Sequence, residues 1–117
     1  MRAFWTAATE LDPGARDLTE DRRFRFCTGW GLADLAHRAG FSHVKTMKIE
    51  APTRFQNFDD FWHPFTLGAG PAPGYFVNLK TTEREKLREK LRQGLPTAED
   101  GSITLNKRAW AIRGRKR

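Results

Sequence analysis

The segment from Thr28 to Ala51 places the strongest constraint on the fold, because it combines a helix, a glycine stop and a strand. Thr28 can cap a helix whose apolar stripe consists of Leu32, Leu35, Ala36 and Ala39. Gly40 is placed to end that helix in a left-handed conformation, with Phe41 folding back on its last turn. Apolar and charged residues then alternate from Val44 to Ala51, which predicts a strand that Pro52 interrupts. Helix, glycine and strand make half of a βαβ unit, so the pattern predicts an α/β fold that needs neighbouring strands.

Three further elements are predicted from the rest of the chain. Phe4, Ala8 and Leu11 share one face of an N-terminal helix that the sequence from Asp12 to Gly14 ends. Thr82–Gln93 reads as a helix with a Thr82/Glu85 capping box, and Ser102–Arg113 reads as a strand after an Asp100-Gly101 turn. Residues 15–28 are expected to form a surface connection, with a short extended segment at Phe24 and Phe26.

Residues 53–79 form an aromatic-rich segment that resembles an inserted lid. Its aromatic residues are Phe55, Phe58, Phe61, Trp62, Phe65, Tyr75 and Phe76. Asn57 can cap a short helix with Asp59 and Asp60 at its positive end. The glycine- and proline-rich residues 68–74 are expected to form a loop. Aromatic-rich loops of this length are often lids or binding walls.

Composition excludes several classes of protein. The 117 residues allow one domain, and one cysteine with three scattered histidines rules out a disulfide scaffold and a zinc finger. No apolar stretch approaches the roughly 20 residues of a membrane helix, and no signal pattern is present, so a cytoplasmic protein without a membrane partner is expected. The net charge is +7, with local excess at Arg22, Arg23 and Arg25 and in the basic tail at residues 113–117.

Four stretches together resemble the C-terminal part of class I S-adenosylmethionine-dependent methyltransferases, closest to the small-molecule, ubiquinone-biosynthesis-like enzymes of bacteria. They are PTRFQNFDDFWHPF at residues 52–65, GAGPAPGY at 68–75, LPTAEDGS at 95–102 and AWAIRG at 109–114. FWTAA at residues 4–8 also looks like the helix that follows the fourth or fifth strand of that fold. The resemblance covers nearly the whole chain but only half of such an enzyme.

The resemblance implies a partial Rossmann-like sheet that is incomplete as a domain. Residues 1–117 would form one partial domain with two strands, expected as an antiparallel pair, and about four helices. Val44–Ala51 would be the sixth strand and Ser102–Arg113 the seventh. The chain would be a truncated gene product or one half of a split protein, with an N-terminal half or a second copy as partner. Uncovered apolar residues such as Ile49, Trp110 and Ile112 predict self-association of the isolated chain.

The intact family uses S-adenosylmethionine as cofactor, but this chain is not expected to bind it alone. Such a site needs a strand, a glycine-rich turn and a carboxylate for the ribose hydroxyls. Gly68, Gly70 and Gly74 have the wrong spacing and no preceding buried strand. No cofactor-binding or metal-binding residue is therefore assigned.

The resemblance places a small-molecule methyl acceptor against the aromatic segment. The candidate substrate-binding residues are Trp5, Phe61, Trp62, Phe65 and Tyr75, and ordinary core packing is the alternative for all five. His63 is the candidate general base, against a surface or structural role. Asp59 and Asp60 read first as helix caps, and Cys27 reads as inert because no histidine accompanies it.

A second function comes from a different class, namely a small basic module that binds nucleic acid or another protein. Its tail and exposed aromatic residues would combine phosphate contacts with stacking. Nucleic acid is the less expected partner, because glutamates stand beside the lysines and arginines from Lys80 to Arg92.

Overall fold

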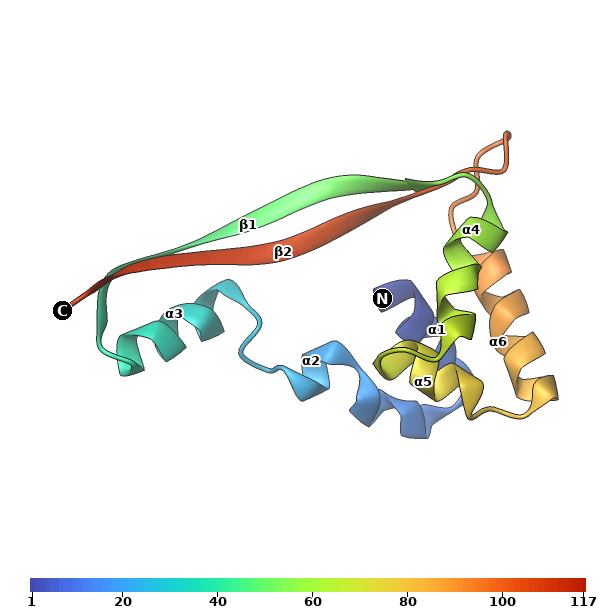
Figure 1. The fold of residues 1–117 in the computed structure, drawn as a ribbon, viewed down its shortest axis with the longest axis horizontal. Coiled ribbons are helices and arrows are strands. Elements are labelled where there is room, and N and C mark those ends of the chain that lie inside the picture. The colour runs from blue at the N-terminus through green and yellow to red at the C-terminus, as the bar shows by residue number, and fades with distance from the viewer. The chain divides into compact units, whose positions relative to one another are not determined.

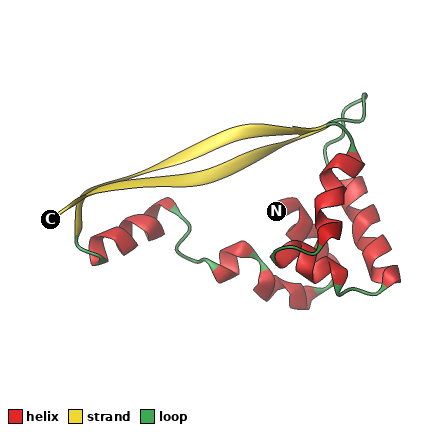
Figure 2. Ribbon diagram, viewed as in Figure 1, coloured by secondary structure: helices red, strands yellow, loops and turns green.

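The computed structural model describes residues 1–117, which form six α-helices, two 3-10 helices and one two-stranded antiparallel sheet (Figures 1 and 2). The predicted antiparallel pair is confirmed, and the chain is more helical than the expected four helices. It divides into two compact units. Unit 1 comprises Met1–Thr19 and Arg54–Leu105, and unit 2 comprises Glu20–Thr53 and Asn106–Arg117. Both strands pass from one unit into the other.

Unit 1 is a helical cluster. Its helices are α1 (Arg2–Leu11), the 3-10 helix η1 (Pro13–Leu18), α4 (Phe58–Trp62), the 3-10 helix η2 (His63–Leu67), α5 (Pro71–Val77) and α6 (Thr81–Gly94). α1 packs against α6, and the Lys90 ammonium of α6 lies 2.6 Å from the Glu10 carboxylate of α1. The predicted N-terminal helix is confirmed, and it ends where Asp12 becomes extended.

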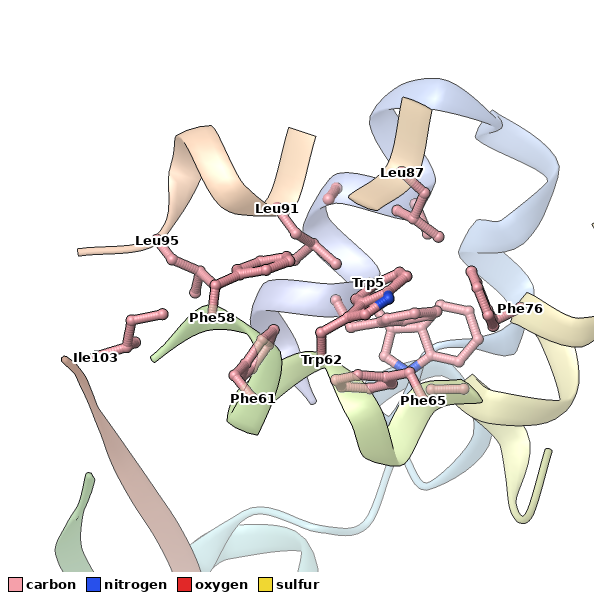
Figure 3. Packing of buried hydrophobic residues seen from close by; sticks show 14 of the residues in the cluster. Trp5, Phe58, Phe61, Trp62, Phe65, Phe76, Leu87, Leu91, Leu95 and Ile103 are labelled. Atoms are coloured by element: carbon pink, nitrogen blue, oxygen red, sulfur yellow. The ribbon is translucent and has the colours of Figure 1, made fainter. Parts of the chain in front are cut away.

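The hydrophobic core lies entirely within unit 1 (Figure 3). Its members are Phe4, Trp5, Ala7, Ala8, Ala15, Phe58, Phe61, Trp62, Phe65, Ala72, Phe76, Leu87, Leu91, Leu95 and Ile103. The predicted leucine stripe of α6 is confirmed, because Leu87, Leu91 and Leu95 are all buried. Aromatic side chains of α1, α4 and η2 fill the space opposite these leucines.

The predicted N-terminal helix caps at Thr28 and Asn57 are confirmed, and the one at Thr82 is wrong. The Asn57 side chain accepts a hydrogen bond from the backbone N–H of Asp60 at 2.9 Å, as expected for α4. The Thr82/Glu85 capping box is not formed, because α6 begins one residue earlier. The Glu83 carboxylate instead accepts the backbone N–H of Lys80 at 2.9 Å. A carboxylate in the first turn also suits the positive end of the helix.

The glycine- and proline-rich residues 68–74 are not a loop throughout, since α5 begins at Pro71. Pro71 and Pro73 lie in the first turn, where backbone N–H groups have no partner within the helix. The missing N–H groups of the two prolines therefore cost nothing there. Gly70 precedes the helix with φ of 89°, a conformation that favours glycine.

Unit 2 contains α2 (Glu20–Arg23), α3 (Gly29–Arg38) and most of the two strands, β1 (Phe41–Phe55) and β2 (Ile103–Lys116). α3 is as predicted: the Thr28 hydroxyl accepts the N–H of Gly31 at 2.9 Å, and Gly40 follows the helix with φ of 85°. Phe41 packs against Gly114 of β2, where an added Cβ would lie 3.1 Å from the Phe41 Cβ.

β1 is longer than predicted and continues through Pro52 to Phe55. The expectation that Pro52 ends the strand is wrong, because each strand of a two-stranded sheet has one free edge. A proline needs no hydrogen-bond partner for an N–H on that edge. β2 likewise extends beyond Arg113, so most of the basic tail is part of the sheet.

Residues 15–28 are more helical than expected. η1 and α2 occupy much of this connection, and Phe24 and Phe26 form an edge-to-face pair with ring centroids 6.2 Å apart. The Asp12 side chain accepts the N–H of Gly14 at 3.0 Å, which satisfies a free donor at the start of η1.

The predicted extended segment at Phe24 and Phe26 is wrong. The N–H of Phe24 donates to the Glu20 carbonyl at 2.7 Å and that of Cys27 donates to the Phe24 carbonyl at 3.0 Å, which are turn contacts and not strand pairing.

α3 covers one face of the two-stranded sheet. A Cβ on Gly29 would lie 3.0 Å from the Trp110 ring and 3.4 Å from the Thr46 hydroxyl, so glycine permits this close approach. Ser42, Val44 and Thr46 are half-buried, whereas the alternating residues of β1 are exposed. No residue of unit 2 is buried. The predicted exposure of Ile49 and Ile112 is confirmed, and Trp110 is half-buried.

None of the helices combines the length and the apolar character required to cross a membrane.

Two leucines of unit 1 offer a matched test of where the stability resides. Leu87 is 1% exposed and Leu67 is 65% exposed. We expect Leu87→Ala to lower the free energy of unfolding by about 2 to 5 kcal/mol through a core cavity. Leu67→Ala should change it by no more than about 0.5 kcal/mol. Urea unfolding followed by circular dichroism measures both, and equal effects would contradict the assigned core.

Candidate functional site

Four of the five candidate substrate-binding residues lie in the interior of unit 1. Trp5, Phe61, Trp62 and Phe65 are each less than a tenth exposed. Figure 3 shows their rings packed together between the leucines of α6 and the chain around η2. The ring centroids of Phe61 and Phe65 lie 5.3 Å apart, and those of Trp62 and Phe65 lie 5.9 Å apart. In this arrangement the four rings act as core, and contact with an acceptor would require them to become exposed.

Tyr75 is the candidate that combines aromatic packing with an accessible polar group. Its ring lies 5.6 Å from the Trp5 ring and 6.3 Å from the Phe4 ring, between centroids. Its hydroxyl donates a hydrogen bond to the Asp12 carboxylate at 3.0 Å. Partial burial, that hydrogen bond and the nearby charges of Asp12 and Glu83 raise the pKa of Tyr75 to about 12. The structure therefore places a neutral phenol and a carboxylate at the edge of the aromatic core.

His63 is exposed at the start of η2, where its carbonyl accepts a hydrogen bond from the Thr66 hydroxyl at 2.7 Å. No carboxylate or hydroxyl is hydrogen-bonded to its ring. A general base is usually oriented by such a partner. His63 is thus accessible but not oriented within this chain.

The two acidic residues of α4 have structural partners. The Asp60 carboxylate accepts the backbone N–H of Gln56 at 2.9 Å, and the Asp59 carboxylate pairs with Arg88 at 3.1 Å. These contacts agree with the interpretation of both residues as helix-terminal groups. Cys27 is exposed and free.

Arginines of α6 form a set of contacts that the sequence analysis missed. The guanidinium groups of Arg88 and Arg92 lie 5.3 and 4.7 Å from the centre of the Phe58 ring, and that of Arg84 lies 5.4 Å from the Phe76 ring. Arg84 also donates to the carbonyls of Leu79 and Val77. The four-residue spacing of the arginines is a sequence signal for one helix face. These cations cover the aromatic core.

The turn before β2 holds a second polar cluster. The Asp100 carboxylate accepts the hydroxyl and the backbone N–H of Ser102 at 2.6 and 2.9 Å, and pairs with Arg54 at 2.9 Å. These contacts lower the pKa of Asp100. Gly101 has φ of 82°, which confirms the predicted turn. An open surface depression nearby is lined by Pro96, Thr97, Ala98, Ser102 and Thr104, and none of the aromatic candidates contributes to it.

The glycine-rich residues 68–74 do not form the strand, turn and helix of a nucleotide-binding site. The glycines at 68, 70 and 74 surround the start of α5 and follow a 3-10 helix rather than a strand. No group of three His, Cys, Asp or Glu side chains is arranged to hold a metal.

Comparisons with known proteins give no match, whether with protein families, curated proteins or solved structures.

The Tyr75 hydroxyl supports a direct test, because Tyr75 is the only tyrosine of the chain. We expect an absorbance titration of tyrosinate to give an apparent pKa near 12, and Asp12→Asn to move it toward the ordinary value of about 10. A folded-state pKa above the unfolded one stabilises the fold below pH 10 and loses this contribution as pH rises toward 12.

Stability measurements provide the second readout of the same pair. Between pH 10 and 12 the wild-type protein should lose more free energy of unfolding than Tyr75→Phe, which has no phenol to ionise. A wild-type phenol that titrates near pH 10, or identical pH profiles for both proteins, would show that the Asp12 hydrogen bond is absent.

Proposed function

We propose that this chain is the C-terminal part of a class I S-adenosylmethionine-dependent methyltransferase and contributes the last strands and an aromatic acceptor-side segment. The methyl group would pass from the cofactor sulfonium to a small-molecule acceptor in an in-line displacement. The cofactor itself would be held by residues outside this chain. The proposal starts from the resemblance of the four sequence stretches at residues 52–65, 68–75, 95–102 and 109–114.

The observation that supports the proposal most is the open, two-stranded sheet of unit 2. α3 is followed by β1, then by a helical insertion, and then by the antiparallel β2, the order expected for the end of such a fold. The sheet has only two strands, and none of its unit 2 residues is buried. Two-stranded sheets are marginally stable in water, so added strands would supply the missing burial.

In this proposal only the surface residues of the aromatic segment contact the acceptor, and not all five candidate residues. Trp5, Phe61, Trp62 and Phe65 build the core that fixes the segment, and Tyr75 and His63 lie at its surface. At neutral pH the Tyr75 phenol stays protonated and donates its O–H to Asp12, which orients it, so the phenol oxygen can accept a further hydrogen bond. An acceptor would meet this phenol and not the buried rings.

The test begins by translating the DNA immediately upstream of the Met1 codon. The polypeptide extended by that sequence and the 117-residue chain are then expressed separately and compared. We expect an upstream strand, glycine-rich turn and helix, and calorimetric binding of S-adenosylmethionine only by the extended polypeptide. The chain alone serves as the matched control, because it lacks that turn.

Two outcomes would overturn the proposal. One is micromolar binding of S-adenosylmethionine by the chain alone. The other is an upstream region without the strand and glycine-rich turn.

Light scattering of the isolated chain tests the open sheet separately. We expect self-association at physiological salt, because each strand of the two-stranded sheet has a free edge that can pair with a second copy. A monomer that melts in one sharp transition would show that unit 2 is complete without added strands.

A further inference from the structure

The net positive charge of the protein lies in unit 2. Unit 2 carries twelve Lys and Arg against four Asp and Glu, a net charge of +8, whereas unit 1 carries nine against ten, a net charge of −1. The net charge of +7 is therefore not spread over the surface. A local excess of this kind attracts a polyanion.

The two strands carry most of this excess. Within unit 2 the strands contain seven cations, and Arg117 directly after β2 is the eighth. The seven are Lys45, Lys48, Lys107, Arg108, Arg113, Arg115 and Lys116. Glu50 is the only acidic residue of the strands within unit 2, and it pairs with Lys48 at 3.9 Å. The other seven cations make no ion pair.

Several of these cations share the sheet face that α3 leaves open. Thr46 and Trp110 face α3, so the residues that alternate with them project from the opposite face. These are the residues of odd number from Lys45 onward in β1 and from Lys107 onward in β2, since the positive φ of His43 breaks the alternation before Lys45. Lys45, Lys107, Arg113 and Arg115 lie there and are exposed. Between Lys45 and Ala51 and between Lys107 and Arg115, this face holds no acidic residue. Like charges on one sheet face repel one another, and an anionic partner would relieve that repulsion.

We propose that this open face of the β1–β2 ribbon binds the phosphate backbone of a double-stranded nucleic acid. A two-stranded antiparallel ribbon is narrow enough to enter a major groove. The part of β1 in unit 2 has thirteen residues, which span about 40 Å, and many duplex phosphates lie within such a length. Arginine binds phosphate oxygens in a bidentate manner, which suits Arg113 and Arg115.

Other occupants fit this face less well. It carries no Phe, Tyr or Trp between Lys45 and Ala51 or between Lys107 and Arg115, so single-stranded bases find no stacking platform. Met47 and Ile49 are its large apolar side chains, too few for insertion into a lipid surface. A second copy would bring an equal positive charge. The inference is independent of the proposed methyltransferase function.

The experiment measures binding of the full chain to a labelled 20-base-pair duplex by fluorescence anisotropy at 50 and 200 mM NaCl. If Lys45, Lys107, Arg113 and Arg115 each contact one phosphate, a plot of the logarithm of the binding constant against the logarithm of the salt concentration has a slope of about −3.6. This slope is roughly a hundredfold loss of affinity between 50 and 200 mM NaCl. The variant K45Q/R113Q/R115Q should reduce the slope to about −1 and weaken binding at least about tenfold at 50 mM salt.

Two further variants isolate the role of this face. R2Q/R16Q/K86Q removes the same charge from exposed residues of unit 1 and should leave the slope unchanged. K45R/R113K/R115K keeps the charge and should keep the salt slope, while the loss of the bidentate arginine contacts lowers the affinity at both salt concentrations. Melting curves by circular dichroism confirm that each variant is folded.

Four outcomes would overturn the proposal: no duplex binding at 50 mM salt, equal losses in the unit 1 and ribbon variants, tighter binding of a single-stranded oligonucleotide, or binding to phosphatidylserine vesicles in preference to the duplex.

Discussion

The helices of unit 1 are held together by the burial of aromatic side chains. Phe4 is fully buried and stacks on Phe65 with ring centroids 4.7 Å apart, and Phe76 meets Trp62 edge to face at 4.9 Å. Burial of large apolar side chains is the main favourable term in folding. Because unit 2 buries no residue, unit 1 supplies most of that term for the chain.

This uneven burial gives the two units different physical roles. Unit 1 keeps its short helices in place by packing them around one core and by covering that core with arginines. Unit 2 has caps and strand pairing but little apolar burial, and it carries the net charge. Its remaining surface is available to another chain at the strand edges and to an anion at the open sheet face. The methyltransferase proposal concerns the edges, whereas the nucleic-acid proposal concerns that face.

The candidate site was only partly predictable from the sequence. The aromatic segment was identified correctly as a cluster, but the sequence left open whether it forms a pocket or a core. The leucine face of α6 decides this, because Leu87 and Leu91 lie opposite the rings and exclude solvent from them. The pairing of Tyr75 with Asp12 spans 63 positions, and no local pattern indicates it.

Elements with local signals could be predicted from the amino-acid sequence. The Thr28 and Asn57 caps, the left-handed Gly40, the leucine stripe of α6 and the alternation in β1 each depend on neighbouring residues and backbone preferences. The continuation of β1 through Pro52 follows from its pairing with β2, because that pairing leaves β1 one free edge. The tertiary structure also turns the aromatic rings inward and brings the cations together in unit 2. Contacts between distant segments fix these features, and the order of residues along the chain does not encode them locally.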